Sequence, residues 1–111
     1  MIEFEVTHPE DGVGVVVPRG RLNMVSARRL KELLSELVAA GSTRIVVDMG
    51  ETTFLDSSGL GALIAGLKTA RQAGGDLRVA RPTEAVRLVF QLTNMDKVLR
   101  PRDSVEGAFD V

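Results

Sequence analysis

The residues best suited to chemistry form the run 54–61, Phe-Leu-Asp-Ser-Ser-Gly-Leu-Gly, in which two adjacent hydroxyls follow a carboxylate. An apolar stretch gives way to helical spacing here, which predicts a strand-to-helix junction. The first amides of a helix lack intrahelical partners, and a short side-chain oxygen can accept from them. The same amides also favour a phosphate. Ser57 and Ser58 are therefore candidates for helix capping, the commoner role, or for carrying a phosphoryl group.

A catalytic role for either serine is a weaker alternative. A nucleophile elbow reads Gly-x-Ser-x-Gly, whereas here the glycines follow the serines. The single histidine, His8, precedes Pro9 in an expected hairpin turn and is poorly placed as a general base. The nearby acidic residues Asp48, Glu51 and Asp56 lack the spacing of a calcium loop. We therefore expect no enzyme, no metal site and no cofactor.

Composition narrows the class of molecule. The chain has 111 residues, no cysteine and a formal net charge of −1. These values predict one domain spanning residues 1–111, without disulfides or thiolate metal sites, in a reducing cytoplasm. The lack of a basic excess, tyrosine and tryptophan argues against direct nucleic-acid binding. With no signal peptide and no apolar run near about 20 residues, we also expect no membrane contact.

The elements that must position the run 54–61 alternate between strand and helix patterns. Apolar residues alternate over 2–6, turn residues occupy 9–12, and a β-branched run over 13–17 ends at Pro18, which predicts a hairpin. Three- and four-residue spacing over 27–38 predicts an amphipathic helix. Its expected N-cap is Asn23 or Ser26, and Gly41 lies just past its end.

The rest of the chain continues this alternation. The other expected elements are a central strand over 45–47, a helix over 58–73 ended by Gly74-Gly75, a strand around 77–79, a helix from 82–84 with an apolar face of Val86, Val89, Phe90 and Leu92, a short strand at 98–99 and a helical turn within 103–109. This order predicts an α/β fold: a single mixed sheet of four to five strands packed against about four helices.

The helix after Asp56 carries Gly59, Gly61 and Gly66 in its first turns. Each glycine costs about 1 kcal/mol relative to alanine in a helix interior, so something must compensate. Close packing of the helix on the sheet is one explanation. The other is a small-residue surface where a partner's backbone approaches, with Leu60 as an apolar anchor. Because a helix has two faces, both can hold.

Taken together, these residues resemble the anti-sigma factor antagonist family, whose fold is the STAS domain. The run 54–61, preceded by 45–48 (Ile-Val-Val-Asp), carries the resemblance. The segment 20–23 (Gly-Arg-Leu-Asn) is similar to the family's Gly-x-Leu/Ile-Asp, and 74–77 (Gly-Gly-Asp-Leu) also fits. The resemblance extends from about Ile2 to Phe109 and implies the same fold throughout.

The resemblance implies a binding protein. In the family, the unphosphorylated antagonist binds an anti-sigma factor that is also a serine kinase, and this frees a sigma factor. The kinase then phosphorylates the first serine of the motif, the complex dissociates, and a phosphatase restores binding. By position, the phosphoacceptor is Ser57, its neighbours are Asp56, Ser58 and Asn23, and the partner-binding residues are Gly59, Leu60 and Met24.

One residue departs from the family pattern, and one alternative stays open. Asn23 stands where many members have aspartate, so partner choice or the response to phosphorylation could differ. The alternative is a permanent STAS interaction module, a scaffold or a transporter-associated protein, in which Ser57 only caps a helix.

Overall fold

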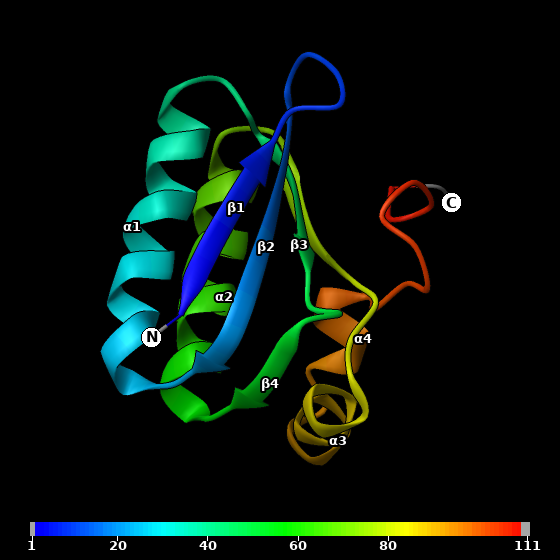
Figure 1. Ribbon diagram of the computed structural model, residues 1–111. Helices are drawn as coiled ribbons and strands as arrows, with labels where there is room; N and C mark the ends of the chain where they lie inside the picture. Colours follow the sequence, from blue (N-terminus) through cyan, green and yellow to red (C-terminus); the bar gives the residue numbers. More distant parts are fainter. Residues whose placement is uncertain (1, 110–111) are drawn as a thin grey trace.

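The chain forms a mixed five-stranded sheet with two long helices on one face (Figure 1). The structure, a computed structural model, describes residues 2–109. In chain order the elements are β1 (Glu3–Thr7), β2 (Val13–Leu22), α1 (Met24–Ala39), β3 (Arg44–Asp48), β4 (Thr52–Leu55), α2 (Ser57–Gln72), β5 (Asp76–Ala80), α3 (Glu84–Thr93) and α4 (Asp96–Leu99). The predicted fold class is confirmed.

Strand β2 organises the sheet because it has two parallel partners in succession. Its middle, residues 15–19, pairs with the antiparallel β1, while its first residues pair with β3 and its last residues with β4. The predicted end of this strand at Pro18 is therefore wrong. The Pro18 carbonyl accepts a hydrogen bond from Thr52 Oγ1 (3.0 Å) at the change from β3 to β4, where the missing proline N–H breaks no ladder.

Two further elements differ from the prediction. Strand β4, which ends at the predicted junction within 54–61, was not counted among the expected strands. The pair 98–99, predicted as a strand, lies in the short helix α4, with Leu99 fully buried. The helical turn predicted within 103–109 is a hydrogen-bonded turn over 105–109, and Ser104 Oγ accepts from the Gly107 amide (3.1 Å). At the end of β5, Ala80 forms an isolated parallel bridge with Arg102, and the described residues form no sixth strand there.

The sheet has a core on each face. Helices α1 and α2 cover one face, where Val16 and Leu22 of β2 are fully buried (Figure 1). The alternate residues of β2 belong to the smaller core on the other face, which the segment 105–109 partly covers. The residues of that smaller core are Val13, Val15, Val17, Val46, Ala80 and Ala108.

Helix α3 presents a narrower apolar face than the sequence suggested. Val86 and Phe90 are fully buried and Val89 is partly buried. Leu92, predicted for the same face, is 76% exposed, and Leu88 is also exposed. The correction follows from helical geometry, because Leu92 is two residues beyond Phe90 and points well away from the Val86–Phe90 line.

Candidate functional site

The carboxyl ends of β2 and β4 lie side by side, and each strand leads directly into a long helix. Leu22 and Leu55 are paired in parallel register, and the Asp56 amide donates to the Leu22 carbonyl (3.3 Å). Figure 1 shows α1 and α2 starting at the same edge of the sheet. This pairing brings the segment around Asn23 next to the segment around Ser57, which are far apart in the sequence.

Asn23 is the N-cap of α1. Its Oδ1 accepts hydrogen bonds from the amides of Val25 (3.0 Å) and Ser26 (3.3 Å). The Asn23 amide in turn donates to Ser26 Oγ (3.0 Å), so the two residues form a capping box. Of the two expected caps, Asn23 is the cap and Ser26 is its partner within the helix. The Asn23 side chain is therefore held in one orientation beside the start of α2.

Asp56 is the N-cap of α2, and its Oδ1 accepts from the Gly59 amide (2.9 Å). Ser57 is the first residue of the helix and is exposed, while Ser58 is partly exposed. Within residues 2–109 neither serine hydroxyl makes a hydrogen bond. Asp56 therefore supplies the cap, and the structure does not support the alternative in which Ser57 caps the helix. The Ser57 side chain is open to solvent.

The glycines of α2 divide between packing and surface. A Cβ atom on Gly59 would stand 2.5 Å from the Leu22 carbonyl oxygen, and one on Gly66 would overlap Cδ1 of Leu34. Both are buried, so each allows α2 to approach a neighbouring element. Gly61 is exposed, and a Cβ there would meet nothing within 4 Å. Close packing therefore explains Gly59 and Gly66, whereas Gly61 belongs to the exposed small-residue surface.

Apolar side chains are exposed around the two helix starts. Met24 is 74% exposed and Val25 is 86% exposed at the beginning of α1, and Leu60 is partly exposed in the first turn of α2. Of the residues expected at a partner surface, Met24 and Leu60 are accessible. Gly59 is buried, so its contribution to such a surface would be to position α2 and not to touch a partner.

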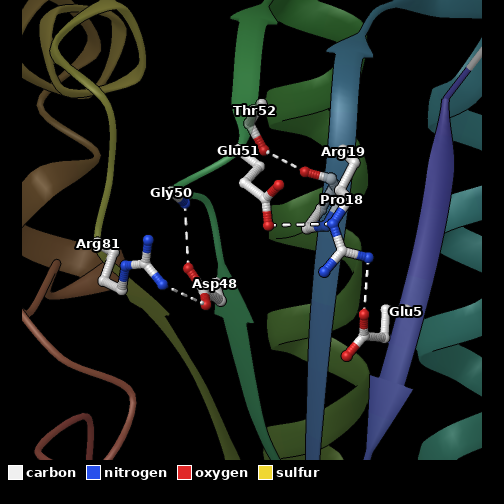
Figure 2. Close-up of polar contacts among 8 residues, drawn as sticks. All are labelled: Glu5, Pro18, Arg19, Asp48, Gly50, Glu51, Thr52 and Arg81. Atoms are coloured by element: carbon white, nitrogen blue, oxygen red, sulfur yellow. Dashed lines mark hydrogen bonds and ion pairs between the residues drawn. The ribbon is translucent and has the colours of Figure 1, made fainter.

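A charged network fixes the loop between β3 and β4 (Figure 2). It lies on the face of the sheet that α1 and α2 do not cover. Arg19 joins Glu5 (2.7 Å) on β1 to Glu51 (3.0 Å) in this loop, and these two partners raise the pKa of the Arg19 guanidinium. Buried Asp48 accepts from the Gly50 amide (3.0 Å) and from Arg81 Nη1 (3.3 Å). The network holds the loop that leads through β4 to Ser57.

This network was not predicted from the sequence. Asp48 does end a strand, and Glu51 is exposed as expected, yet each has a cationic partner. The partners Arg19 and Arg81 come from segments 32 and 33 residues away in the chain. The sequence contains no local signal for pairs at this separation. The network has a structural role, since it joins β1, β2 and the loop between β3 and β4.

Residues 2–109 show neither a metal centre nor a membrane-spanning helix. The part of the chain that the structure describes contains no group of three or more histidine, cysteine, aspartate or glutamate residues that could hold a metal ion. None of its helices is long and apolar enough to cross a membrane. His8 is exposed in the β1–β2 turn, and its Nδ1 lies 3.1 Å from the Val13 carbonyl oxygen.

Comparison with known proteins gives consistent results. A model of the STAS domain family matches residues 5–108. The crystal structure of an anti-sigma factor antagonist from Mycobacterium paratuberculosis is 30% identical, with a TM-score of 0.85, covering 97% of this chain and 91% of that chain. Two relatives, from Thermotoga maritima and Bordetella bronchiseptica, have names that assign them provisionally to the anti-sigma factor antagonists. The Thermotoga maritima relative is 28% identical over 101 residues, which cover 90% of this chain and 89% of that protein. The Bordetella bronchiseptica relative is 29% identical over 98 residues, which cover 88% of this chain and 84% of that protein.

Proposed function

Because the chain belongs to the STAS domain family, we propose that it is an anti-sigma factor antagonist whose binding is switched off by phosphorylation of Ser57. The unmodified chain binds an anti-sigma factor that is also a serine kinase, in the cytoplasm, and a sigma factor is released. A phosphatase reverses the modification. The chain itself catalyses nothing. The proposal depends on one observation. The Ser57 side chain is exposed, and its hydroxyl does not cap α2 because Asp56 Oδ1 accepts the Gly59 amide instead.

The position of Ser57 suits it to carry a phosphate without unfolding the domain. Phosphorylation adds a charge of about −1.5 to −2 at pH 7 and three acceptor oxygens. At the first residue of α2, the free amides and the helix dipole stabilise that charge. The side chain points to solvent, so the phosphate displaces no packed group. The effect of the modification therefore falls on a bound partner.

The size of the effect follows from simple electrostatics. A partner carboxylate about 4–5 Å from the phosphate is repelled by about 1 kcal/mol per unit charge in a water-like dielectric. At an effective dielectric near 20 the repulsion rises to about 3–4 kcal/mol. Since about 1.4 kcal/mol is a tenfold change in affinity, one such contact lowers affinity by a few-fold to several-hundred-fold. Desolvation of the phosphate in a closed interface adds to the loss.

The surface around Ser57 supports a protein partner. Met24 offers exposed apolar area at the start of α1, and Leu60 is partly exposed in the first turn of α2. A permanent interaction module, in which Ser57 only caps α2, would need the hydroxyl to bond a helix amide. Asp56 makes that bond instead. The switched protein is therefore the better interpretation.

The test is to incubate the chain with candidate cognate serine kinases and ATP and to locate phosphate by peptide mass spectrometry. Binding of each form to the kinase is measured by calorimetry. We expect modification at Ser57, constitutive binding by Ser57→Ala and weak binding by Ser57→Asp. Ser58→Ala is the matched control and should behave like the unaltered chain. Full phosphorylation of Ser57→Ala would move the acceptor to Ser58, and equal affinity of both forms would refute the switch.

A further inference from the structure

Strand β1 forms one edge of the sheet, and its outer side has no strand partner among residues 2–109. Its inner side pairs antiparallel with β2, with Phe4 opposite Pro18 and Val6 opposite Val16. An edge strand presents unpaired backbone N–H and C=O groups, which makes it a template for a further strand. The hydrogen bonds of β2 decide which residues of β1 present these groups.

The unpaired backbone groups of β1 belong to Phe4 and Val6. On the side of β2 away from β1, the Pro18 carbonyl accepts from Thr52 Oγ1 (3.0 Å), and the Gly20 amide donates to the loop before β4 (3.1 Å). Because backbone groups alternate in direction along a strand, the even-numbered residues of β2 turn away from β1. They lie opposite the even-numbered residues of β1, so Phe4 and Val6 turn their backbone groups to the open edge. A strand added there would leave the ladder to β2 intact.

A recess of about 280 Å³ lies between β1 and α1, on the helix-covered face of the sheet. Figure 1 shows α1 alongside β1, on the side away from β2. The recess takes its apolar lining from both elements and its charged lining from α1. The lining residues are Phe4, Val6, Arg29, Glu32, Leu33 and Glu36. Side chains alternate between the two faces of a strand, so every second side chain of an added strand would enter this recess.

The surface around the open edge is rich in carboxylates. Glu3 and Glu5 are exposed on the other face of β1, and Glu32 and Glu36 are exposed beside the recess. Of these four, Glu5 alone forms an ion pair within residues 2–109, and its partner Arg19 also bonds the loop between β3 and β4. Opposite charges on neighbouring strands attract and like charges repel, so this edge favours basic side chains.

The other nearby cations do not balance these carboxylates. Arg29 lines the recess with its Cζ 6.0 Å from the centre of the Phe4 ring, and it forms no ion pair in the described part of the chain. Arg21, the next cation along β2, is turned toward Phe54 of β4 (4.1 Å) and so away from β1. Four carboxylates therefore face Arg29 and the shared Arg19.

A second copy of this chain is a poor occupant of the edge. In an antiparallel pair of β1 strands, Glu5 lies opposite or diagonal to a glutamate of the other copy whichever of Phe4 and Val6 are paired. The charges at the edge thus disfavour self-association and favour a segment of opposite charge.

We propose that the open edge of β1 binds an extended segment of a partner protein in which apolar and basic side chains alternate, and that this segment adds a strand to the sheet. Main-chain hydrogen bonds to Phe4 and Val6 hold the segment. Its apolar side chains enter the recess, and its basic side chains lie beside Glu3 and Glu5. The inference goes beyond the proposed function, because Ser57 follows β4 on the other side of β2 and takes no part in it.

The probe is the peptide acetyl-Lys-Val-Lys-Val-Lys-Val-amide, titrated into the ¹⁵N-labelled full chain and followed by NMR. The control peptide has glutamate at the three lysine positions. We expect the basic peptide to shift the amide signals of Phe4 and Val6, to slow their hydrogen exchange, and to bind about tenfold more tightly than the acidic peptide. The difference should shrink in about 1 M salt, where the Debye length falls to about 3 Å.

Variants of the chain locate the contact. Val6→Pro removes an outward N–H and spares the ladder to β2, so it should weaken the basic peptide about tenfold. Glu3→Lys keeps every backbone group, and it should weaken the basic peptide several-fold and strengthen the acidic one. Glu84→Lys is the matched control for charge, because Glu84 is exposed at the start of α3, beside β4, and should leave both affinities unchanged.

The inference would be overturned by equal affinity for the two peptides, by signal shifts confined to residues outside β1 and α1, or by undiminished binding to Val6→Pro and Glu3→Lys. Slower exchange of the Phe4 and Val6 amides on concentrating the chain alone would also overturn it, because a second copy would then occupy the edge. The titration uses the unmodified chain and no kinase, so its outcome is independent of the phosphorylation experiment.

Discussion

Gly59 packs so closely against the carbonyl oxygen of Leu22 that a Cβ atom at position 59 would stand 2.5 Å from that oxygen. The same carbonyl accepts the Asp56 amide at 3.3 Å. One backbone group at the end of β2 therefore fixes the start of α2. The separation between the Asn23 cap and the Ser57 hydroxyl depends on the missing side chain at position 59.

Replacement of Gly59 by alanine should destabilise the domain although alanine is the better helix former. The new methyl group would meet the Leu22 carbonyl and Cδ1 of Leu55 (2.7 Å), and the carbonyl cannot move without disturbing β2. Overpacking of this kind costs about 1–3 kcal/mol, which exceeds the gain of about 1 kcal/mol in helix propensity. The measurement is urea unfolding, in which the midpoint should fall with an unchanged slope.

The matched control is Gly61→Ala, two residues further along the same helix. Gly61 is exposed, and a methyl group at this position would have no neighbouring atom within 4 Å. Only the propensity gain remains, so the free energy of unfolding should rise by about 0.5–1 kcal/mol. If Gly59→Ala were as stable as Gly61→Ala, the close approach of α2 to Leu22 would be contradicted.

Ser57→Asp should leave folding intact while it weakens partner binding. An acidic residue in the first turn of α2 is favoured by the helix dipole, so the free energy of unfolding should stay level or rise by up to about 1 kcal/mol. Ser35→Asp is the control, because Ser35 is exposed in the middle of α1, where Glu32 three residues before it and Lys31 four residues before it offset each other, so stability should change by less than about 0.5 kcal/mol. A large loss of stability in Ser57→Asp would show that its effect on binding comes from unfolding.

Asn23 offers a test of the position at which the chain departs from its family. Asn23→Asp keeps the Oδ1 acceptor for the Val25 and Ser26 amides and adds a negative charge at the helix start. We expect a gain of about 0.3–1 kcal/mol in unfolding free energy that diminishes at high salt. Asn23→Ala removes both bonds and should cost about 0.5–2 kcal/mol. A salt-independent effect of Asn23→Asp would contradict the dipole explanation.

Local signals in the sequence were sufficient for the two helices that frame the candidate site. The cap Asn23 and the apolar spacing of α1 and α2 lie within single segments, so type and spacing predict them. The cap Asp56 was not predicted, because Ser57 and Ser58 were the capping candidates of α2. The exposure of Ser57 follows from its place at a helix start. By contrast, the choice between capping and a free hydroxyl needed the structure, because both Asp56 and Ser57 are good caps.

Features that depend on distant segments could not be predicted. Strand β4 has four residues and exists because β2 is long enough to pair with it after β3 ends. The Arg19 network joins β1, β2 and the loop after β3, and no periodicity in the sequence links these segments. The recess between β1 and α1 likewise combines two separate segments. Each of these features depends on which distant segments lie side by side in the fold, and not on the local sequence pattern.

Asp76 should make stability depend on pH in the acid range. Burial alone would raise the pKa of this carboxyl. Hydrogen bonds from the Leu77 amide (2.9 Å) and Arg71 Nε (3.0 Å), with the charges of Arg71 and Arg78, outweigh burial and lower it. Because the folded pKa lies below the unfolded value near 3.9, the stabilisation is complete above that value and is lost as pH falls through the folded pKa.

Asp76→Asn isolates this contribution in urea unfolding measured between about pH 3 and pH 7. At neutral pH the variant should be less stable by about 1 kcal/mol, because ion pairs partly open to solvent contribute little and a charged hydrogen bond somewhat more. The gap should stay constant down to about pH 5 and narrow below about pH 4 as the native carboxylate is protonated. Asp103→Asn is the control, since Asp103 is exposed and forms no ion pair within residues 2–109. A gap at pH 3 as large as at pH 7 would show that Asp76 acts through its shape and not through its charge.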